Sequence, residues 1–155
     1  HYDRLLMLEP LEYKDVQKLQ EFVIAIDTSG SCSGALVQRF LQETWTIFQE
    51  REKFFAHMNI HIIQCDCVIQ EHVKITCRDE WQQYLETIQI KGHGDTDFTP
   101  VFRLVDQLME DGEFRHLKGL LYFTDGDGIY PDVEPVYETA FVFINQKLKN
   151  AGLGI

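Results

Sequence analysis

The sequence predicts an α/β fold in which a Rossmann-like, doubly wound and mainly parallel sheet carries one antiparallel edge strand. Continuous apolar runs alternate along the chain with segments of helical periodicity, which is typical of strand–helix–strand units. The apolar runs are unbroken rather than alternating, as expected for strands covered on both faces. A short link between two β-branched segments predicts a hairpin, and therefore the antiparallel edge.

The domain is expected to begin after a short lead-in. Residues 1–20 mix apolar and charged residues without a clean period and include Pro10 and a helix-like piece, 11–19. We expect them to pack on a domain that spans residues 21–155. The chain starts with His1 rather than Met, which suggests a piece of a longer protein.

The first strand and helix are the clearest elements. The run Phe22 to Ile26 is wholly apolar, which predicts a central strand. Ser33 is a plausible N-cap for the next helix, whose apolar residues recur at helical spacing from Leu36 to Phe48. That helix is expected to end near residues 51–55.

The middle of the chain predicts the edge hairpin. The β-branched run "MNIHIIQCDCVIQ" covers residues 58–70, and "HVKITC" covers residues 72–77. The link at Gln70-Glu71 is too short for a crossover, so the second strand is expected to turn back beside the first. "DEWQQYLETI" then predicts a short amphipathic helix capped by Asp79.

The remaining elements repeat the strand and helix pattern. "KGHGDTD" is a glycine-rich loop, followed by the helix "PVFRLVDQLMED" with Pro100 in its first turn and Gly112 just past its end. "LKGLLYFTDGDG" predicts a strand that ends in acidic and glycine residues, and "TAFVFIN" predicts the last strand. The tail is too short for a full closing helix.

Charge and cysteine usage narrow the classes of partner. A formal net charge of −11 in 155 residues argues against nucleic acid and against an anionic membrane surface, which attract basic faces. It favours cations or basic partners, although acidity also serves solubility. The four cysteines form no C-x-x-C pair, so we expect reduced thiols and a cytoplasmic location. A zinc site with His61 or His72 is the alternative.

Polar residues collect in three clusters that follow strands or precede a helix. They are Asp27-Thr28-Ser29-Gly30-Ser31, Gly94-Asp95-Thr96-Asp97 and Thr124-Asp125-Gly126-Asp127-Gly128. If the first and third end adjacent strands, Asp27 and Asp125 meet at the edge where ligands bind in open parallel sheets. The clusters contain no lysine or arginine, and buried carboxylates need a countercharge. A bound cation would supply it. Carboxylate and hydroxyl oxygens suit Mg²⁺, and also Mn²⁺ or Ca²⁺.

Two familiar motifs match these clusters only in part. Gly30-Ser31-Cys32-Ser33-Gly34 imitates a nucleophile elbow, but Cys32 stands at its centre. Asp125 to Gly128 imitates a calcium loop, but Ile129 stands where the next acidic ligand belongs. Taken singly, each cluster is accounted for by helix capping or turn formation. Only the three together favour a metal site.

The same motifs resemble those of von Willebrand factor A (VWA) domains. Asp27 to Ser31 matches their D-x-S-x-S element, "GDTDFTPVF" looks like their G-G-T-D loop, and "LLYFTDGDG" resembles their strand ending in T-D-G. The resemblance runs from Glu21 to Ile144. "IDTSGS", "IIQCD" and "YFTDGDGIYP" look closer still to the C-terminal VWA-like domain of bacterial metallopeptidase-like proteins, whose peptidase-like part lies upstream.

The resemblance implies a metal-ion-dependent adhesion site (MIDAS). By matching positions, Ser29, Ser31 and Thr96 would offer hydroxyl oxygens to the metal, and Asp27 and Asp125 would act directly or through water. Asp97 would support the site or cap the helix rather than bind the metal. Asp95 departs from the pattern, because it replaces the usual glycine before the threonine. The short tail lacks the final helix that switches integrin-type domains.

The expected function is therefore a non-catalytic, metal-dependent protein-binding module. The partner would complete the metal shell with an acidic side chain, and the resemblance suggests an AAA ATPase system of the MoxR type. One alternative is a degenerate VWA scaffold without metal. Another is a metal-assisted hydrolase that uses as its base His93, the only histidine close in sequence to the three motifs. No H-E-x-x-H zinc-peptidase motif occurs.

Overall fold

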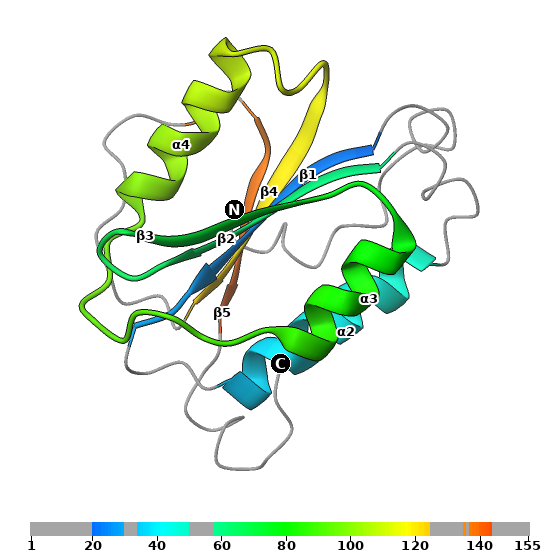
Figure 1. Cartoon of the computed structure of the whole chain (residues 1–155). Coiled ribbons are helices and arrows are strands. Elements are labelled where there is room, and N and C mark those ends of the chain that lie inside the picture. Colours follow the sequence, from blue (N-terminus) through cyan, green and yellow to red (C-terminus); the bar gives the residue numbers. More distant parts are fainter. Residues whose placement is uncertain (1–19, 30–33, 50–57, 125–134, 136, 144–155) are drawn as a thin grey trace.

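The computed structural model describes residues 20–29, 34–49, 58–124, 135 and 137–143 of the chain (Figure 1). They form eight elements, which we list in chain order: β1 (Gln20–Asp27), α2 (Gly34–Gln49), β2 (Met58–Cys65), β3 (Ile69–Ile75), α3 (Arg78–Thr87), α4 (Thr99–Glu110), β4 (Leu117–Thr124) and β5 (Thr139–Phe143). Gln20, the last residue of the predicted lead-in, begins β1. The rest of the lead-in, the predicted cap Ser33, the predicted helix end at 51–55 and the C-terminal tail lie outside the described residues.

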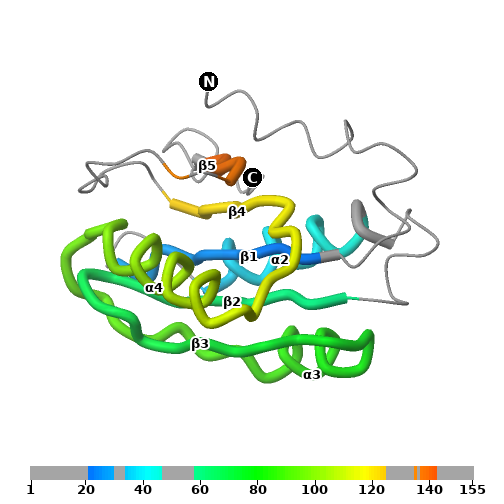
Figure 2. The backbone as a smooth tube through the Cα atoms, turned by 90° about the horizontal axis from the view of Figure 1, so that it is seen from above, coloured from blue at the N-terminus to red at the C-terminus, as the bar shows by residue number. Residues whose placement is uncertain are grey.

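One five-stranded sheet, in the order β3-β2-β1-β4-β5, forms the centre of the molecule (Figure 2). β1 runs parallel to both of its neighbours, β2 and β4, and β4 runs parallel to β5. β3 lies antiparallel to β2 at the edge. The chain moves from β1 to β2 on one side and later adds β4 on the other, so the strand order reverses between β1 and β4. The predicted mainly parallel α/β fold with one antiparallel edge strand is confirmed.

Helices cover both faces of the sheet (Figure 1). α2 and α3 lie on one face, and α4 lies on the other. Alternate residues of β1 face the two helical layers. Ile24 and Ile26 pack with α2 and α3, whereas Val23 and Ala25 pack with α4. All four are inaccessible to solvent. This burial on both faces explains why the β1 sequence reads as an unbroken apolar run.

The edge hairpin forms as predicted, but the predicted turn at Gln70-Glu71 is wrong. Both residues lie inside β3, and the chain reverses at residues 66–68 instead. The Asp66 carboxylate accepts a hydrogen bond from Val68 N at 3.1 Å, and Val68 O accepts one from Asp66 N at 3.2 Å. A local side-chain turn of this kind competes with strand extension, so the apolar run ends at Cys65.

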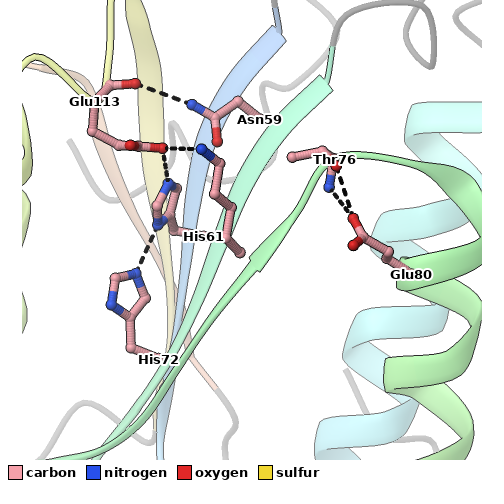
Figure 3. A network of polar contacts seen from close by, with 7 residues as sticks. Asn59, His61, His72, Thr76, Glu80 and Glu113 are labelled. Atoms are coloured by element: carbon pink, nitrogen blue, oxygen red, sulfur yellow. Dashed lines mark hydrogen bonds and ion pairs between the residues drawn. The ribbon is translucent and has the colours of Figure 1, made fainter.

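The start of α3 also differs from the prediction. Asp79 lies inside the first turn, and the N-cap is Cys77, which makes no side-chain capping bond. Glu80 acts in its place: its Oε1 accepts hydrogen bonds from Thr76 N at 2.7 Å and Thr76 Oγ1 at 2.9 Å (Figure 3). A first-turn carboxylate that reaches back to the preceding residues fixes the entry of the chain, as in a capping box. In contrast, α4 has the predicted proline in its first turn, and Gly112 follows it with φ at +81°.

A polar network joins the amino-terminal half of β2 to β3 and to the segment after α4 (Figure 3). His61 Nε2 lies 3.0 Å from Glu113 Oε2, which also pairs with Lys74 Nζ at 2.6 Å. His61 Nδ1 lies 2.7 Å from His72 Nε2. Because the ionised carboxylate accepts, neutral His61 carries its proton on Nε2, and His72 donates to Nδ1. Burial lowers the pKa of His61 and of His72.

The described residues also bear on membrane association and on the state of the cysteines. None of the helices within the described residues is long and apolar enough to cross a membrane. Cys65, Cys67 and Cys77 are free thiols, of which only Cys65 is buried.

Candidate functional site

Asp27 is a buried carboxylate at the carboxyl end of the central strand. It is fully shielded from solvent, although it ends the apolar run of β1. Its Oδ1 accepts a hydrogen bond from Ser29 N at 2.8 Å, and its Oδ2 accepts one from Thr124 Oγ1 at 2.6 Å. Among the described residues, no lysine, arginine or histidine forms an ion pair with it. Two neutral donors therefore hold a buried negative charge at this edge.

The contact with Thr124 shows that the first and third polar clusters meet. β1 and β4 are adjacent parallel strands, with Ile26 paired to Phe123, so their last residues reach the same edge of the sheet. Thr124 is itself fully buried. Asp125, the predicted ligand that follows it, lies outside the described residues, as does Ser31.

The second polar cluster lies against the ends of β1 and β2. His93 N donates to Thr28 O at 2.8 Å, and Thr28 N donates to Cys65 O at 3.0 Å. These bonds run from the loop to the residue after β1, and from there to the end of β2. Thr96, the predicted hydroxyl ligand, is partly buried in this loop. The structure therefore brings the segment of Thr96 to the edge that carries Asp27 and Ser29.

Asp66 holds this loop from the end of β2. Its Oδ2 accepts from Gly94 N at 3.0 Å, its backbone oxygen accepts from Asp97 N at 3.0 Å, and its Oδ1 accepts from Gln70 Nε2 at 3.0 Å. Burial raises the pKa of this carboxyl, but the hydrogen bonds from Gln70, Val68 and Gly94 outweigh that effect and hold the pKa below its usual value. Asp66 is thus an ionised carboxylate whose acceptor positions face the loop and the hairpin turn.

The glycines of the loop permit the close approach. A Cβ placed on Gly92 would lie 2.8 Å from Asp66 Oδ2 and 2.8 Å from Thr28 Oγ1. A Cβ placed on Gly94 would lie 2.9 Å from Asp66 Oδ2. Gly92 has φ at +124° and His93 has φ at +77°, so two consecutive residues use positive φ. Side chains at either glycine would push the loop away from Asp66.

Gln64 fixes the point at which the chain enters the loop. Its Oε1 accepts from Lys91 N at 2.9 Å, and its Nε2 donates to Glu71 Oε1, Tyr84 Oη and Gln89 O at 3.0–3.2 Å. Gln64 is fully buried within β2. A buried amide whose oxygen and nitrogen both have partners is a stable anchor.

The other end of the loop is fixed by the core and by Asp97. Phe98 is fully buried and meets Tyr122 of β4 edge to face, with ring centroids 4.8 Å apart. Asp97 Oδ1 accepts a hydrogen bond from Thr99 N at 2.9 Å, so its side chain binds a backbone amide in the first turn of α4.

The Cys65 thiol lies at the end of β2, and burial raises its pKa to about 12. That thiol stays protonated and is not a nucleophile at neutral pH.

Comparison with known families identifies the chain. A family model described as "VWA-like domain (DUF2201)" matches residues 22–152. The chain belongs to this family. A comparison with curated proteins found no match.

The described part of the VWA-like domain includes three of the five predicted metal ligands, Asp27, Ser29 and Thr96, on two segments that lie at one edge of the sheet. Sequence reasoning assigned no role to Asp66, Thr124 or Gln64. Asp66 and Gln64 lie in the motif "IIQCD", which carries part of the resemblance, and Thr124 lies in the T-D-G motif. A polar residue at the end of an apolar run is the pattern they share with Asp27.

The described donors of the VWA-like domain fit a hard divalent cation. No three His, Cys, Asp or Glu side chains within the described ranges gather closely enough to bind a metal, so a cation at this edge would depend on hydroxyl oxygens as well. Asp27 supplies a buried charge that lacks a basic partner there, and Ser29 lies directly beside it. Because each carboxylate oxygen of Asp27 already accepts one bond, a metal-bound water is a suitable further donor.

Proposed function

We propose that this VWA-like domain is a non-catalytic protein-binding module that depends on a divalent cation, preferably Mg²⁺. The observation that carries the proposal is the buried Asp27 carboxylate, held by two neutral donors at the reversal of strand order. Such an edge is the usual ligand position of open parallel sheets, and a buried carboxylate without a basic partner favours a cation.

Five residues would hold the cation: Asp27, Ser29, Ser31, Thr96 and Asp125. Mg²⁺ keeps part of its hydration shell when a site offers few anionic ligands, and it can accept a carboxylate from outside. The proposed partner therefore offers an aspartate or glutamate side chain. A MoxR-type AAA ATPase system in a larger bacterial protein assembly is the context that the resemblance suggests. Nucleic acid and anionic membranes are not proposed as partners, because the chain is strongly acidic.

Metal binding is tested by thermal unfolding and calorimetric titration with Mg²⁺ and Mn²⁺. The wild-type domain is expected to gain about 2.7 kcal/mol at a metal concentration one hundred times Kd. Asp27→Asn keeps the shape of the side chain but removes its charge, so it is expected to lose this gain. Asp111→Asn removes the same charge at an exposed position after α4 and is expected to keep it. If chelator and added divalent ions leave the wild-type melting temperature unchanged, the metal site is refuted and the degenerate scaffold remains.

The absence of catalysis is tested separately. His93 is the base of the hydrolase alternative; its side chain is exposed, and its backbone rather than its imidazole contacts Thr28. Peptidase and phosphatase assays with Mg²⁺ are expected to give no turnover. A Mg²⁺-dependent hydrolysis that His93→Ala abolishes would favour the enzyme instead.

A further inference from the structure

The loop of residues 91–97 is attached to the sheet at several points, and two of them are on one residue. Gln64 binds Lys91 N, Thr28 O binds His93 N, and Asp66 binds both Gly94 N and Asp97 N. The two bonds to Asp66 bracket Thr96. The bond to Gly94 is the one that uses the carboxylate.

The two oxygens of the Asp66 carboxylate accept hydrogen bonds from two different segments of the chain. Oδ1 accepts from Val68 N and Gln70 Nε2, both in the β2–β3 hairpin, whereas Oδ2 accepts from Gly94 N in the loop. Asp66 is 4% exposed, so its lone pairs are directed at protein donors rather than at bulk water. One side chain thus links the edge hairpin to the segment that carries Thr96.

We propose that Asp66 is a positioning residue of the metal site, which holds Thr96 at the binding edge without binding the metal itself. This inference rests on the proposed metal-dependent function. Its physical basis is that residues which orient a ligand-bearing segment raise metal affinity, because the segment then loses less conformational freedom on binding. The glycines at 92 and 94 serve the same purpose, since a Cβ at either would displace the loop from the carboxylate.

The structure provides a substitution that separates the two halves of this role. Asp66→Asn leaves a single side-chain oxygen and replaces the other with an amide group, which donates. The asparagine oxygen is expected to take the place of Oδ1, because two donors, Val68 N and Gln70 Nε2, bind there and only one binds Oδ2. The bond to Gly94 N is then lost. Asparagine is well suited to turns, so the hairpin is retained. Gln70→Met is the matched control, because it removes a different bond to Asp66 and leaves Gly94 attached.

Two measurements on the whole chain test the proposal. In the metal-free protein, amide hydrogen exchange by NMR is expected to be faster at Gly94 in Asp66→Asn than in wild type, while the amides of β1 and β2 keep their relative protection. Calorimetric titration with Mg²⁺ is expected to give a Kd about ten-fold or more above the wild-type value for Asp66→Asn, and an unchanged Kd for Gln70→Met. If the role of Asp66 were only structural, Asp66→Asn would be less stable than wild type, but its folded form would bind Mg²⁺ with the wild-type Kd.

The failures of the two proposals are distinguishable. If the wild type binds Mg²⁺ and Asp66→Asn binds it equally tightly, the positioning role is refuted and the metal site stands. If the wild type binds no divalent cation, both proposals fall. If Asp66→Asn and Gln70→Met lower the affinity for Mg²⁺ equally, the effect arises from the hairpin as a whole, and the specific role of the bond to Gly94 is refuted.

Discussion

The close contact between Gly92 and its neighbours predicts a large penalty for a single methyl group. In Gly92→Ala the new Cβ would lie 2.8 Å from both Asp66 Oδ2 and Thr28 Oγ1. Real Cβ atoms do not approach oxygens so closely, and Thr28 and Asp66 are both buried. The Asp66 carboxylate cannot move away without breaking its hydrogen bonds to Val68, Gln70 and Gly94, so the loop itself must shift.

The magnitude follows from comparison with Gly112→Ala. Gly112 also has positive φ, at +81°, but a Cβ there meets nothing within 4 Å. Gly112→Ala carries backbone strain of about 1–2 kcal/mol, and Gly92→Ala carries at least as much, because φ at +124° lies further outside the left-handed region that L residues adopt. Both are offset by about 0.4–1 kcal/mol from the lower entropy of the unfolded chain. Only Gly92→Ala adds overcrowding, which costs about 1–3 kcal/mol. We therefore expect Gly92→Ala to be less stable than Gly112→Ala by about 2 kcal/mol, a difference of about 4–8 °C in Tm for a chain of this size.

Urea unfolding and differential scanning calorimetry of the two variants measure this difference directly. Both are done without divalent ions, so that metal binding does not contribute. Equal losses in the two variants would mean that positive φ alone explains the glycines. In that case, the close approach of the loop to Asp66 and Thr28 would be refuted.

Three further predictions concern the fold. Because burial holds the pKa of His61 and His72 below the ordinary 6.5, the unfolded chain takes up protons first as the pH falls. Stability that is present above about pH 6.5 is then lost below it, by up to about 1.4 kcal/mol per pH unit for the buried His61 and by less for His72, whose exposed side chain is screened by solvent. A flat profile in urea unfolding across that range would contradict this. Gln64→Met is expected to cost at least about 2 kcal/mol in the same assay, because it removes all the hydrogen bonds of a fully buried amide, whereas the exposed control Gln83→Met should cost less than about 0.5 kcal/mol. Glu80→Ala removes the carboxylate that holds Thr76 and is expected to cost about 1 kcal/mol; an equal loss in Glu86→Ala, at the other end of α3, would contradict that role.

The fold was predictable because its main determinants are local and periodic. Unbroken apolar runs identified β1 and β4, and the proline and glycine around α4 marked its ends. The turn of the edge hairpin was placed too late in the chain, because Asp66 turns the chain without glycine, proline or asparagine. Its turn depends on side-chain acceptors that the β-branched run around it concealed.

The candidate site was predictable as a set of segments but not as a network. Asp27, Ser29 and Thr96 stand in motifs that can be read in the sequence, whereas the adjacency of β1 and β4 was only the condition under which the first and third clusters would meet. The roles of Gln64 and Asp66 depend on loop residues that lie 27 and 28 positions away in the chain. No periodic pattern encodes such contacts, because they arise only when the loop folds back on the strand ends.

The bond between Thr124 and Asp27 also bears on how the domain is made. It joins positions 97 apart in the chain, so forming it closes a long loop at an entropic cost. A nascent chain that has emerged only as far as α4 already contains β1, β2, β3 and the loop that carries Thr96, but it lacks the strand that completes the edge. The edge at which we propose binding can therefore be completed only after β4 has been synthesised. A partner that recognises it would engage finished molecules and pass over incomplete ones.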